Sequence, residues 1–412
     1  MERRRNLVKQ TTSQPTLLLV DDDEPFQKIL QVHLSEEEYQ VLCCKNGREA
    51  LQLLEEQRGN IDLAIIDVLM PDMDGITLTE TLRSRDSLRH LPILLLTGLS
   101  EPDDIERGLS SGANDYMTKP FHPTELKARI RNLLRVQQFQ RKLEQQYKVM
   151  QHDLEIARDL QLNLIPVSPM QTPVINLAWE YQPSSYVGGD MVNVFALTEN
   201  HYGFYVADVS GHGVASAMLS TWLYHTLKPT MEQLSQLTPT TSKFTGLPLA
   251  SPRSVAVLLD QMLSEKSSDH YITMCYGIYH SPSQRFTYVR CGHPYPILIT
   301  ADGRCEILQE ADGPAIGMSL GIRFVPHTHQ LQPGDRLYFY SDALLESMSP
   351  EGEVFGLDQL CIELIASTHY NLEAQIEYIL NAVQSHQQRH DFDDDVTLLA
   401  MEIPRDLPAS GN

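Results

Sequence analysis

Residues 16–34, TLLLVDDDEPFQKILQVHL, contain the pattern that decides the fold of the first third of the chain. An apolar run ends at three aspartates, and an amphipathic stretch follows directly. The same order of apolar run and amphipathic stretch recurs four more times up to about residue 135. Repeated strand–helix pairs predict a parallel sheet, and apolar runs without polar alternation fit strands that are covered on both faces. We therefore expect an α/β domain with a five-stranded, doubly wound parallel sheet.

The composition is that of a globular protein with an acidic surface. The chain has 412 residues, enough for two or three domains with buried cores, and 42% of them are hydrophobic. The formal net charge is -22. Because binding to nucleic acid phosphates requires a basic face, this charge argues against a nucleic acid partner.

The cysteines and the chain start predict a cytoplasmic protein. None of the 6 cysteines forms a Cys-x-x-Cys pair, so we expect reduced thiols and no zinc or redox motif. The basic start MERRRNLVKQTTSQP has no apolar core behind it, which argues against a signal peptide. No run approaches the roughly 18 apolar residues of a membrane span, so we expect no membrane partner.

Polar side chains follow the predicted strands of the first domain. They are Asp21, Asp22, Asp67, Thr97 and Lys119. Since parallel sheets bind ligands at the carboxyl ends of their strands, these side chains should meet at one edge. Clustered carboxylates suit Mg²⁺, and an aspartate can act as a nucleophile that forms an acyl phosphate. A lysine and a hydroxyl nearby would stabilise the added negative charge.

Four segments of this region resemble the receiver domain of bacterial two-component response regulators. They are LLLVDDDE, DLAIIDVLMPDMDG, ILLLTG and DYMTKPF, and the resemblance covers residues 15–135. It implies that Asp67 accepts a phosphoryl group from a sensor histidine kinase or phosphotransfer protein. It also implies that Asp22 and Asp67, with Asp21 nearby, hold Mg²⁺, helped by the backbone oxygen of Leu69.

Three further residues match the receiver positions that respond to phosphorylation. The resemblance implies that Thr97 and Lys119 contact the phosphoryl group. Tyr116, three residues before the lysine, matches the aromatic position that moves on activation. Thr97 and Tyr116 are therefore the predicted switch residues.

Residues 136–168 are predicted to form a helical linker. The stretch 122–165 lacks glycine and has prolines only near its two ends. From Leu143 onward the apolar residues follow heptad spacing. If the spacing of the apolar residues upstream is continued, it reaches Gln137 and Gln140, which are polar. The heptad register therefore shifts before Leu143, as it does at a stutter or stammer of a coiled coil. Two interpretations stay open: an amphipathic helix packed on a neighbouring domain, or a dimerising coiled coil that makes the chain a homodimer.

Four aspartates stand out in the remainder of the chain, each at a predicted strand boundary beside small residues. They are Asp190, Asp208, Asp342 and Asp394. Each alone is compatible with a turn. Together they form an all-oxygen donor set, which favours Mg²⁺ or Mn²⁺.

This part of the chain resembles the PP2C-type serine/threonine phosphatases of the bacterial branch that controls anti-sigma-factor partner switching. The matching segments are ARDLQLNLIP, VGGD, ADVSGHGVASAM, TMCYGIY, CGHPYPILI, GPAIG, LQPGDRLYFYSDALLE and DDDVTLL. The resemblance covers roughly residues 155–402 and implies an αββα sandwich. We place the phosphatase domain at residues 169–405, between the linker and a tail at 406–412, with a second tail at 1–14.

The same resemblance implies a site, a reaction and a substrate. Two Mn²⁺ or Mg²⁺ ions would be held by Asp190, Asp208, the backbone oxygen of Val209, Asp342 and Asp394, and it stays open whether Asp395 joins them. The reaction would be direct hydrolysis without a phosphoenzyme. His212 and His293 are therefore interpreted as loop residues. The substrate would be a phosphorylated anti-sigma-factor antagonist.

Two positions depart from the family pattern. Asn193 stands where the family usually has a second aspartate, and Ala343 stands where it usually has glycine. Asparagine would remove a negative charge near the metals, and alanine adds a methyl group where the family's glycine permits φ > 0 or close approach of the backbone. These departures keep an alternative open, a pseudophosphatase adaptor that binds a sigma factor or an anti-sigma regulator without catalysis.

Overall fold

The computed structural model describes residues 14–57, 60–98, 102–227, 251–265, 270–318 and 321–406. The chain divides into two compact units, residues 1–150 and 151–412. Most of the two predicted tails, residues 1–13 and 407–412, lies outside the described ranges. Within those ranges, none of the helices combines the length and the apolar content that crossing a bilayer requires.

The first unit contains a five-stranded sheet in the order β2-β1-β3-β4-β5. Every neighbouring pair of strands is parallel, as the sequence predicted. The strands are β1 (Thr16–Val20), β2 (Gln40–Cys44), β3 (Leu63–Asp67), β4 (Ile93–Thr97) and β5 (Asp115–Thr118). Every residue of β3 and β4 is buried, which explains why their sequences lack polar alternation.

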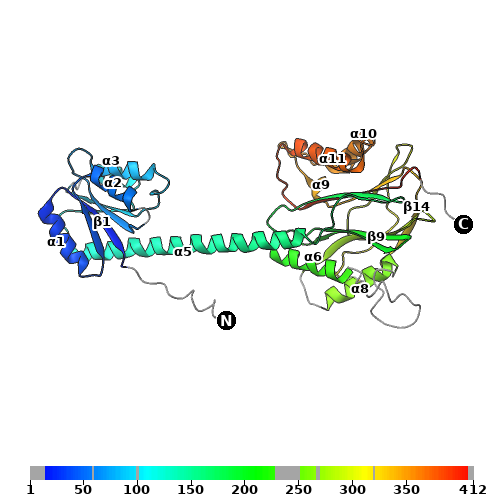
Figure 1. The fold of residues 1–412 in the computed structure, drawn as a ribbon, viewed down its shortest axis with the longest axis horizontal. Coiled ribbons are helices and arrows are strands. Elements are labelled where there is room, and N and C mark those ends of the chain that lie inside the picture. The colour runs from blue at the N-terminus through cyan, green and yellow to red at the C-terminus, as the bar shows by residue number, and fades with distance from the viewer. Residues whose placement is uncertain are drawn as a thin grey trace. The chain divides into compact units, whose positions relative to one another are not determined.

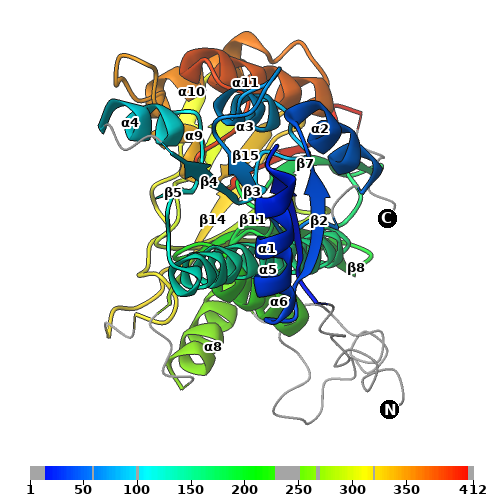
Figure 2. The same ribbon diagram turned by 90° about the vertical axis from the view of Figure 1, so that its left-hand side faces the viewer.

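Helices cover both faces of this sheet (Figures 1 and 2). They are α1 (Glu24–Ser35), α2 (Gly47–Glu56), α3 (Gly75–Arg83), α4 (Pro102–Ser110) and α5 (Pro123–Leu162). One core cluster joins the sheet to α2 and α3, and another joins it to α1 and the first turns of α5. Side-chain caps fix three of the starts: Asp23 caps α1, Asn46 caps α2 and Asp74 caps α3.

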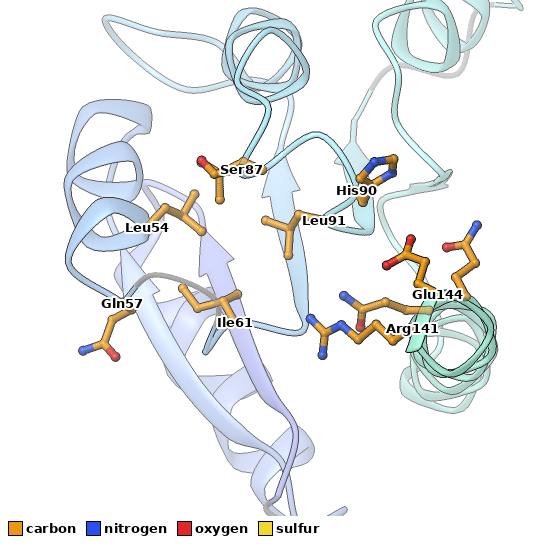
Figure 3. A pocket seen from close by; sticks show the side chains of 11 residues that line it. Leu54, Gln57, Ile61, Ser87, His90, Leu91, Arg141 and Glu144 are labelled. Atoms are coloured by element: carbon orange, nitrogen blue, oxygen red, sulfur yellow. The ribbon is translucent and has the colours of Figure 1, made fainter. Parts of the chain in front are cut away.

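The helix α5 explains the predicted phase change in the linker. Gln137 is only 6% exposed, and it lines a pocket of about 190 Å³ together with Gln140 and Arg141 of the same helix. Figure 3 shows Arg141 and Glu144 on one side of this pocket and Leu54, Ile61 and Leu91 on the other. The polar residues that interrupt the heptad pattern therefore lie where α5 faces Leu54, Ile61 and Leu91 of the first unit.

An ion pair accompanies this contact. Arg141 Nη1 lies 2.8 Å from Asp62 Oδ1, and the other oxygen of Asp62 accepts a hydrogen bond from the backbone N–H of Thr16. Along and beyond this contact, α5 exposes a series of large apolar side chains: Phe139, Leu143, Tyr147, Val149, Met150, Ile156 and Leu160.

The second unit contains two sheets. The five-stranded sheet has the order β14-β11-β10-β9-β8, and the six-stranded sheet has the order β13-β12-β15-β16-β7-β6. The strands of the first are β8 (Met191–Thr198), β9 (His201–Val209), β10 (Ile272–His280), β11 (Arg285–Cys291) and β14 (His327–Gln330). Those of the second are β6 (Met170–Gln171), β7 (Asn176–Gln182), β12 (Ile297–Ile299), β13 (Cys305–Ile307), β15 (Arg336–Tyr340) and β16 (Val396–Glu402).

The two sheets and their helices form four layers (Figure 1). The central core lies between the sheets and includes the stacked rings of Phe204 and Phe286. A second cluster packs the five-stranded sheet against α6 (Val214–Leu227) and α8 (Pro252–Ser264). A third packs the six-stranded sheet against α9 (Ala343–Glu346), α10 (Gly356–Ala366) and α11 (Leu372–Gln387). This is the αββα sandwich that the sequence predicted.

Candidate functional sites

The predicted carboxylates of the first unit come together at the carboxyl ends of β1 and β3. Carboxylate oxygens of Asp21, Asp22 and Asp67 all lie within 4.8 Å of one another. Among the residues that the structure describes, this is the only group of three or more His, Cys, Asp or Glu side chains that close. Three carboxylates at this spacing fit a hard cation such as Mg²⁺, because the positive charge relieves their mutual repulsion.

Lys119 lies between two of these carboxylates. Its Nζ is 2.8 Å from Asp21 Oδ2 and 3.0 Å from Asp67 Oδ2. Burial opposes the charged ammonium, but the two carboxylates more than offset this and raise the pKa of Lys119. Burial raises the pKa of Asp67, although Lys119 works in the opposite direction. The lysine is therefore held as a cation beside the predicted phosphoacceptor.

The other predicted receiver residues lie in β4, in β5 and in the loop after β3. Thr97 ends β4 and is 5% exposed, and Tyr116 is partly buried in β5. Leu69 lies in the loop after β3, and its backbone amide acts with Lys119 to lower the pKa of Asp67, against the larger effect of burial. A glycine is required at position 75, because a Cβ there would lie 2.2 Å from the Asp67 carbonyl oxygen.

In the second unit, three predicted aspartates line one pocket of about 500 Å³. Asp208 lies in β9, Asp342 directly precedes α9, and Asp394 lies in the turn before β16. Asp342 occupies the N-cap position, makes no side-chain cap hydrogen bond there, and lines the pocket. Asp190 lies deeper, 2% exposed, with Oδ2 accepting a hydrogen bond of 2.7 Å from Thr397.

These carboxylates repel one another electrostatically. The pKa of Asp208 is raised to about 7, first by burial and then by Asp342, Asp394 and Asp395. Burial and the neighbouring Asp208 raise the pKa of Asp190, and burial followed by Glu346 raises that of Asp342. Because bound cations would remove both the repulsion and part of the burial cost, this oxygen donor set fits divalent metal ions.

The glycine pair before Asp190 allows the chain to approach this pocket closely. A Cβ on Gly188 would lie 2.3 Å from Asp395 Oδ2 and 2.3 Å from the Tyr181 hydroxyl. A Cβ on Gly189 would lie 2.8 Å from the Val209 carbonyl oxygen. The two glycines thus place Asp190 beside the backbone oxygen that the sequence predicts as a metal ligand.

The structure adds residues to the site that sequence reasoning missed. His212, interpreted above as a loop residue, lines the pocket, and so do Ser184, Ser185, Ser210, Gly211, Tyr271, Thr273 and Asp393. His293 is 1% exposed, and its Nδ1 lies 2.8 Å from the Thr273 hydroxyl. Burial, followed by Arg290, lowers the pKa of His293 to about 3, so the ring supports Thr273 in its neutral form. The glycines on both sides of His212 were the available sequence signal. Thr273 could not be found in this way, because its place beside Asp208 depends on strand pairing.

The two departures from the family pattern do not disturb the pocket. Asn193 is the register partner of Tyr205, so its side chain lies on the sheet face covered by α6 and α8. Ala343 begins α9, and it does not belong to the residues with positive φ in the described part of the chain. The backbone at position 343 therefore does not require glycine.

Two family models match this chain, one in each of its two units. The family model "Response regulator receiver domain" matches residues 17–131, and the model "Stage II sporulation protein E (SpoIIE)" matches residues 198–404. The chain belongs to the SpoIIE family and carries a response regulator receiver domain at its amino-terminal end.

Curated relatives match over a length close to that of the receiver domain. The transcriptional regulatory protein GltR of Pseudomonas aeruginosa is 44% identical over 124 residues, which are 30% of this chain and 50% of GltR. The alkaline phosphatase synthesis transcriptional regulatory protein PhoP of Bacillus subtilis is 41% identical over 119 residues, 29% of this chain and 48% of PhoP. The chain thus spans about half the length of the curated relatives it matches.

A solved structure resembles the second unit in fold. The SiaA-PP2C domain of Pseudomonas aeruginosa superposes with a TM-score of 0.52 and 18% sequence identity, covering 62% of this chain and 98% of that domain. This likeness concerns the fold alone. The chain therefore combines a receiver domain with a PP2C-like domain.

Proposed function

We propose that this chain is a response regulator whose output domain is a metal-dependent protein serine/threonine phosphatase. The observation that carries the proposal is the convergence of Asp208, Asp342 and Asp394 on one pocket, with Asp190 buried beside them. The substrate would be a phosphorylated anti-sigma-factor antagonist, an expectation that rests on the family resemblance.

In the receiver domain, Asp67 would accept a phosphoryl group from a histidine kinase or phosphotransfer protein. Mg²⁺, held by Asp21, Asp22 and Asp67 with the Leu69 carbonyl, would neutralise charge on the transferred group. Lys119 already contacts Asp67, so it is placed to pair with the added negative charge. Thr97 and Tyr116 would carry the switch.

In the phosphatase domain, Asp190, Asp208, Asp342, Asp394 and the Val209 carbonyl would hold the metal ions. Two divalent cations bound there would supply an activated water and neutralise the phosphate oxygens. The side chains that line the pocket would bind and orient the phosphoester. His212 lines the pocket, and we propose that it donates a proton to the leaving serine or threonine oxygen.

The linker helix would connect phosphorylation to hydrolysis. The apolar side chains that α5 exposes, among them Leu143, Tyr147 and Met150, fit the face of a dimerising coiled coil. We propose that phosphorylation of Asp67 changes the association of two chains through this helix. Analytical ultracentrifugation of Leu143→Glu tests this step, because a charge on the stripe should weaken the dimer.

The proposed activity is tested with p-nitrophenyl phosphate and with a phosphoserine peptide, each with and without Mn²⁺. Metal-dependent release of phosphate by the wild type, lost in Asp208→Asn, supports the phosphatase. Release that is equal in the two proteins contradicts it. Mn²⁺ binding without release from either ester favours the adaptor alternative.

A further inference from the structure

Asp395 lies next to a predicted metal ligand, yet its carboxylate is already occupied. It is 7% exposed. Its Oδ1 accepts hydrogen bonds from the backbone N–H of Ser184 at 2.8 Å and from the Ser184 hydroxyl at 3.0 Å. Its Oδ2 accepts from the backbone N–H of Gly189 at 2.6 Å and from that of Asp190 at 3.4 Å. Both oxygens therefore point into the segment 184–190 rather than into the pocket.

The backbone of Asp395 is fixed from other directions. Its N–H donates to Asp394 Oδ1 at 2.8 Å, and its carbonyl oxygen accepts a hydrogen bond of 3.1 Å from the Ser341 hydroxyl. Ser341 directly precedes Asp342. One residue thus joins the three chain segments that carry Asp190, Asp342 and Asp394.

No cation balances this buried charge within the described part of the chain, where the ion pairs do not include Asp395. Its four hydrogen bonds come from N–H and O–H donors, and hydrogen bonds to a charged acceptor are the stronger kind. The fit is also close, because a Cβ on Gly188 would collide with Asp395 Oδ2.

We infer that Asp395 is a positioning residue: it holds the segment 184–190, and with it Asp190 and the pocket-lining Ser184, in place before any metal ion binds. The inference rests on the proposed phosphatase site and names the residue that assembles it. A metal ligand would instead direct at least one oxygen toward the cations.

The test is hydrogen–deuterium exchange of the full chain in a chelator, followed by Mn²⁺ titration calorimetry. In Asp395→Asn the amide places an NH₂ group against N–H donors, so exchange of residues 184–190 should accelerate at least about tenfold. Exchange elsewhere should stay unchanged, and Mn²⁺ affinity should fall about tenfold. Asp394→Asn is the matched control: Mn²⁺ affinity should fall, while metal-free exchange of residues 184–190 stays as in the wild type.

The inference is overturned if Asp395→Asn loses Mn²⁺ affinity while metal-free exchange of residues 184–190 is unchanged, because that is the behaviour of a ligand. If Asp395→Asn accelerates exchange throughout the second unit, the variant is destabilised as a whole, and Ser184→Ala is measured in its place. It removes one hydroxyl donor and should accelerate exchange only locally, by about two- to fivefold. Wild-type exchange in that variant also overturns the inference. Hydrogen–deuterium exchange and Mn²⁺ binding are measured without turnover, so a failure of this inference can be told apart from a failure of the proposed phosphatase activity.

Discussion

The side-chain amide of Gln161 pairs with the backbone of Gly188 in both directions. Its Nε2 donates to the Gly188 carbonyl at 2.7 Å, and the Gly188 N–H donates to Oε1 at 3.1 Å. Nε2 also donates to the Ser220 hydroxyl at 3.0 Å. Gln161 lies near the end of α5 and Gly188 lies two residues before Asp190. The end of the linker helix is therefore bonded directly to the segment that carries a predicted metal ligand.

Replacing Gln161 by alanine should disturb that segment. The change leaves the buried N–H of Gly188 without a partner, at a cost of about 1–3 kcal/mol. The Gly188 carbonyl oxygen keeps only the 3.5 Å hydrogen bond from the Ser220 hydroxyl. We expect faster exchange at residues 187–190 and a changed rate of phosphate release, measured by deuterium exchange and a phosphatase assay. Gln145→Ala, at an exposed position of the same helix, is the control and should leave both unchanged. Equal behaviour of the two variants would contradict this coupling.

Restoring the family's aspartate at position 193 should not improve metal binding. The Asn193 side chain lies on the sheet face covered by α6 and α8, so Asn193→Asp buries a charge away from the pocket. We expect a loss of about 1–3 kcal/mol in stability, seen as a lower melting temperature, with unchanged Mn²⁺ affinity in calorimetry. A gain in Mn²⁺ affinity would show that this side chain reaches the metal site.

The pKa of Asp208 predicts how stability of the metal-free protein depends on pH. The folded state keeps this proton up to about pH 7, whereas the unfolded chain releases it near the ordinary aspartate pKa of 3.8. Between these values the folded state binds more protons, so the free energy of unfolding should fall as pH rises from about 4 to 7. Urea unfolding in a chelator should show this slope, and Asp208→Asn should reduce it. An equal slope in both proteins would contradict the assignment.

Removing the ammonium of Lys119 should have opposite effects on two properties of the receiver. Lys119→Ala takes away the cation that contacts Asp21 and Asp67, so Mg²⁺ should bind severalfold more tightly in calorimetry. Phosphorylation by acetyl phosphate should slow by about 100-fold, because a charge partner of the phosphoryl group is lost. Lys45→Ala, which breaks only an exposed pair with Glu24, should leave both at wild-type values. Weaker Mg²⁺ binding in Lys119→Ala would contradict the proposed arrangement.

Local patterns predicted the strands and helices of the receiver domain, because each strand is a short apolar run followed by an amphipathic stretch. Asp21, Asp67 and Thr97 were found in this way, since each lies at the end of a largely buried strand. The phosphatase-like pocket was less accessible to sequence reasoning. Strand ends indicated Asp208 and Asp342, but Asp395 and Gln161 act through partners more than 20 residues away in sequence. The face on which Asn193 lies depends on strand register, which pairs it with Tyr205 and which the residues alone did not specify.

The most direct test of the account measures phosphate release from a phosphoserine protein substrate by the full chain with Mn²⁺, before and after beryllofluoride is added to occupy Asp67. The account predicts Mn²⁺-dependent release that changes severalfold with beryllofluoride in the wild type. Release should not respond to beryllofluoride in Asp67→Asn, and it should be absent in Asp208→Asn. Release by Asp208→Asn equal to that of the wild type would contradict the phosphatase, and an unchanged wild-type rate would contradict control by Asp67.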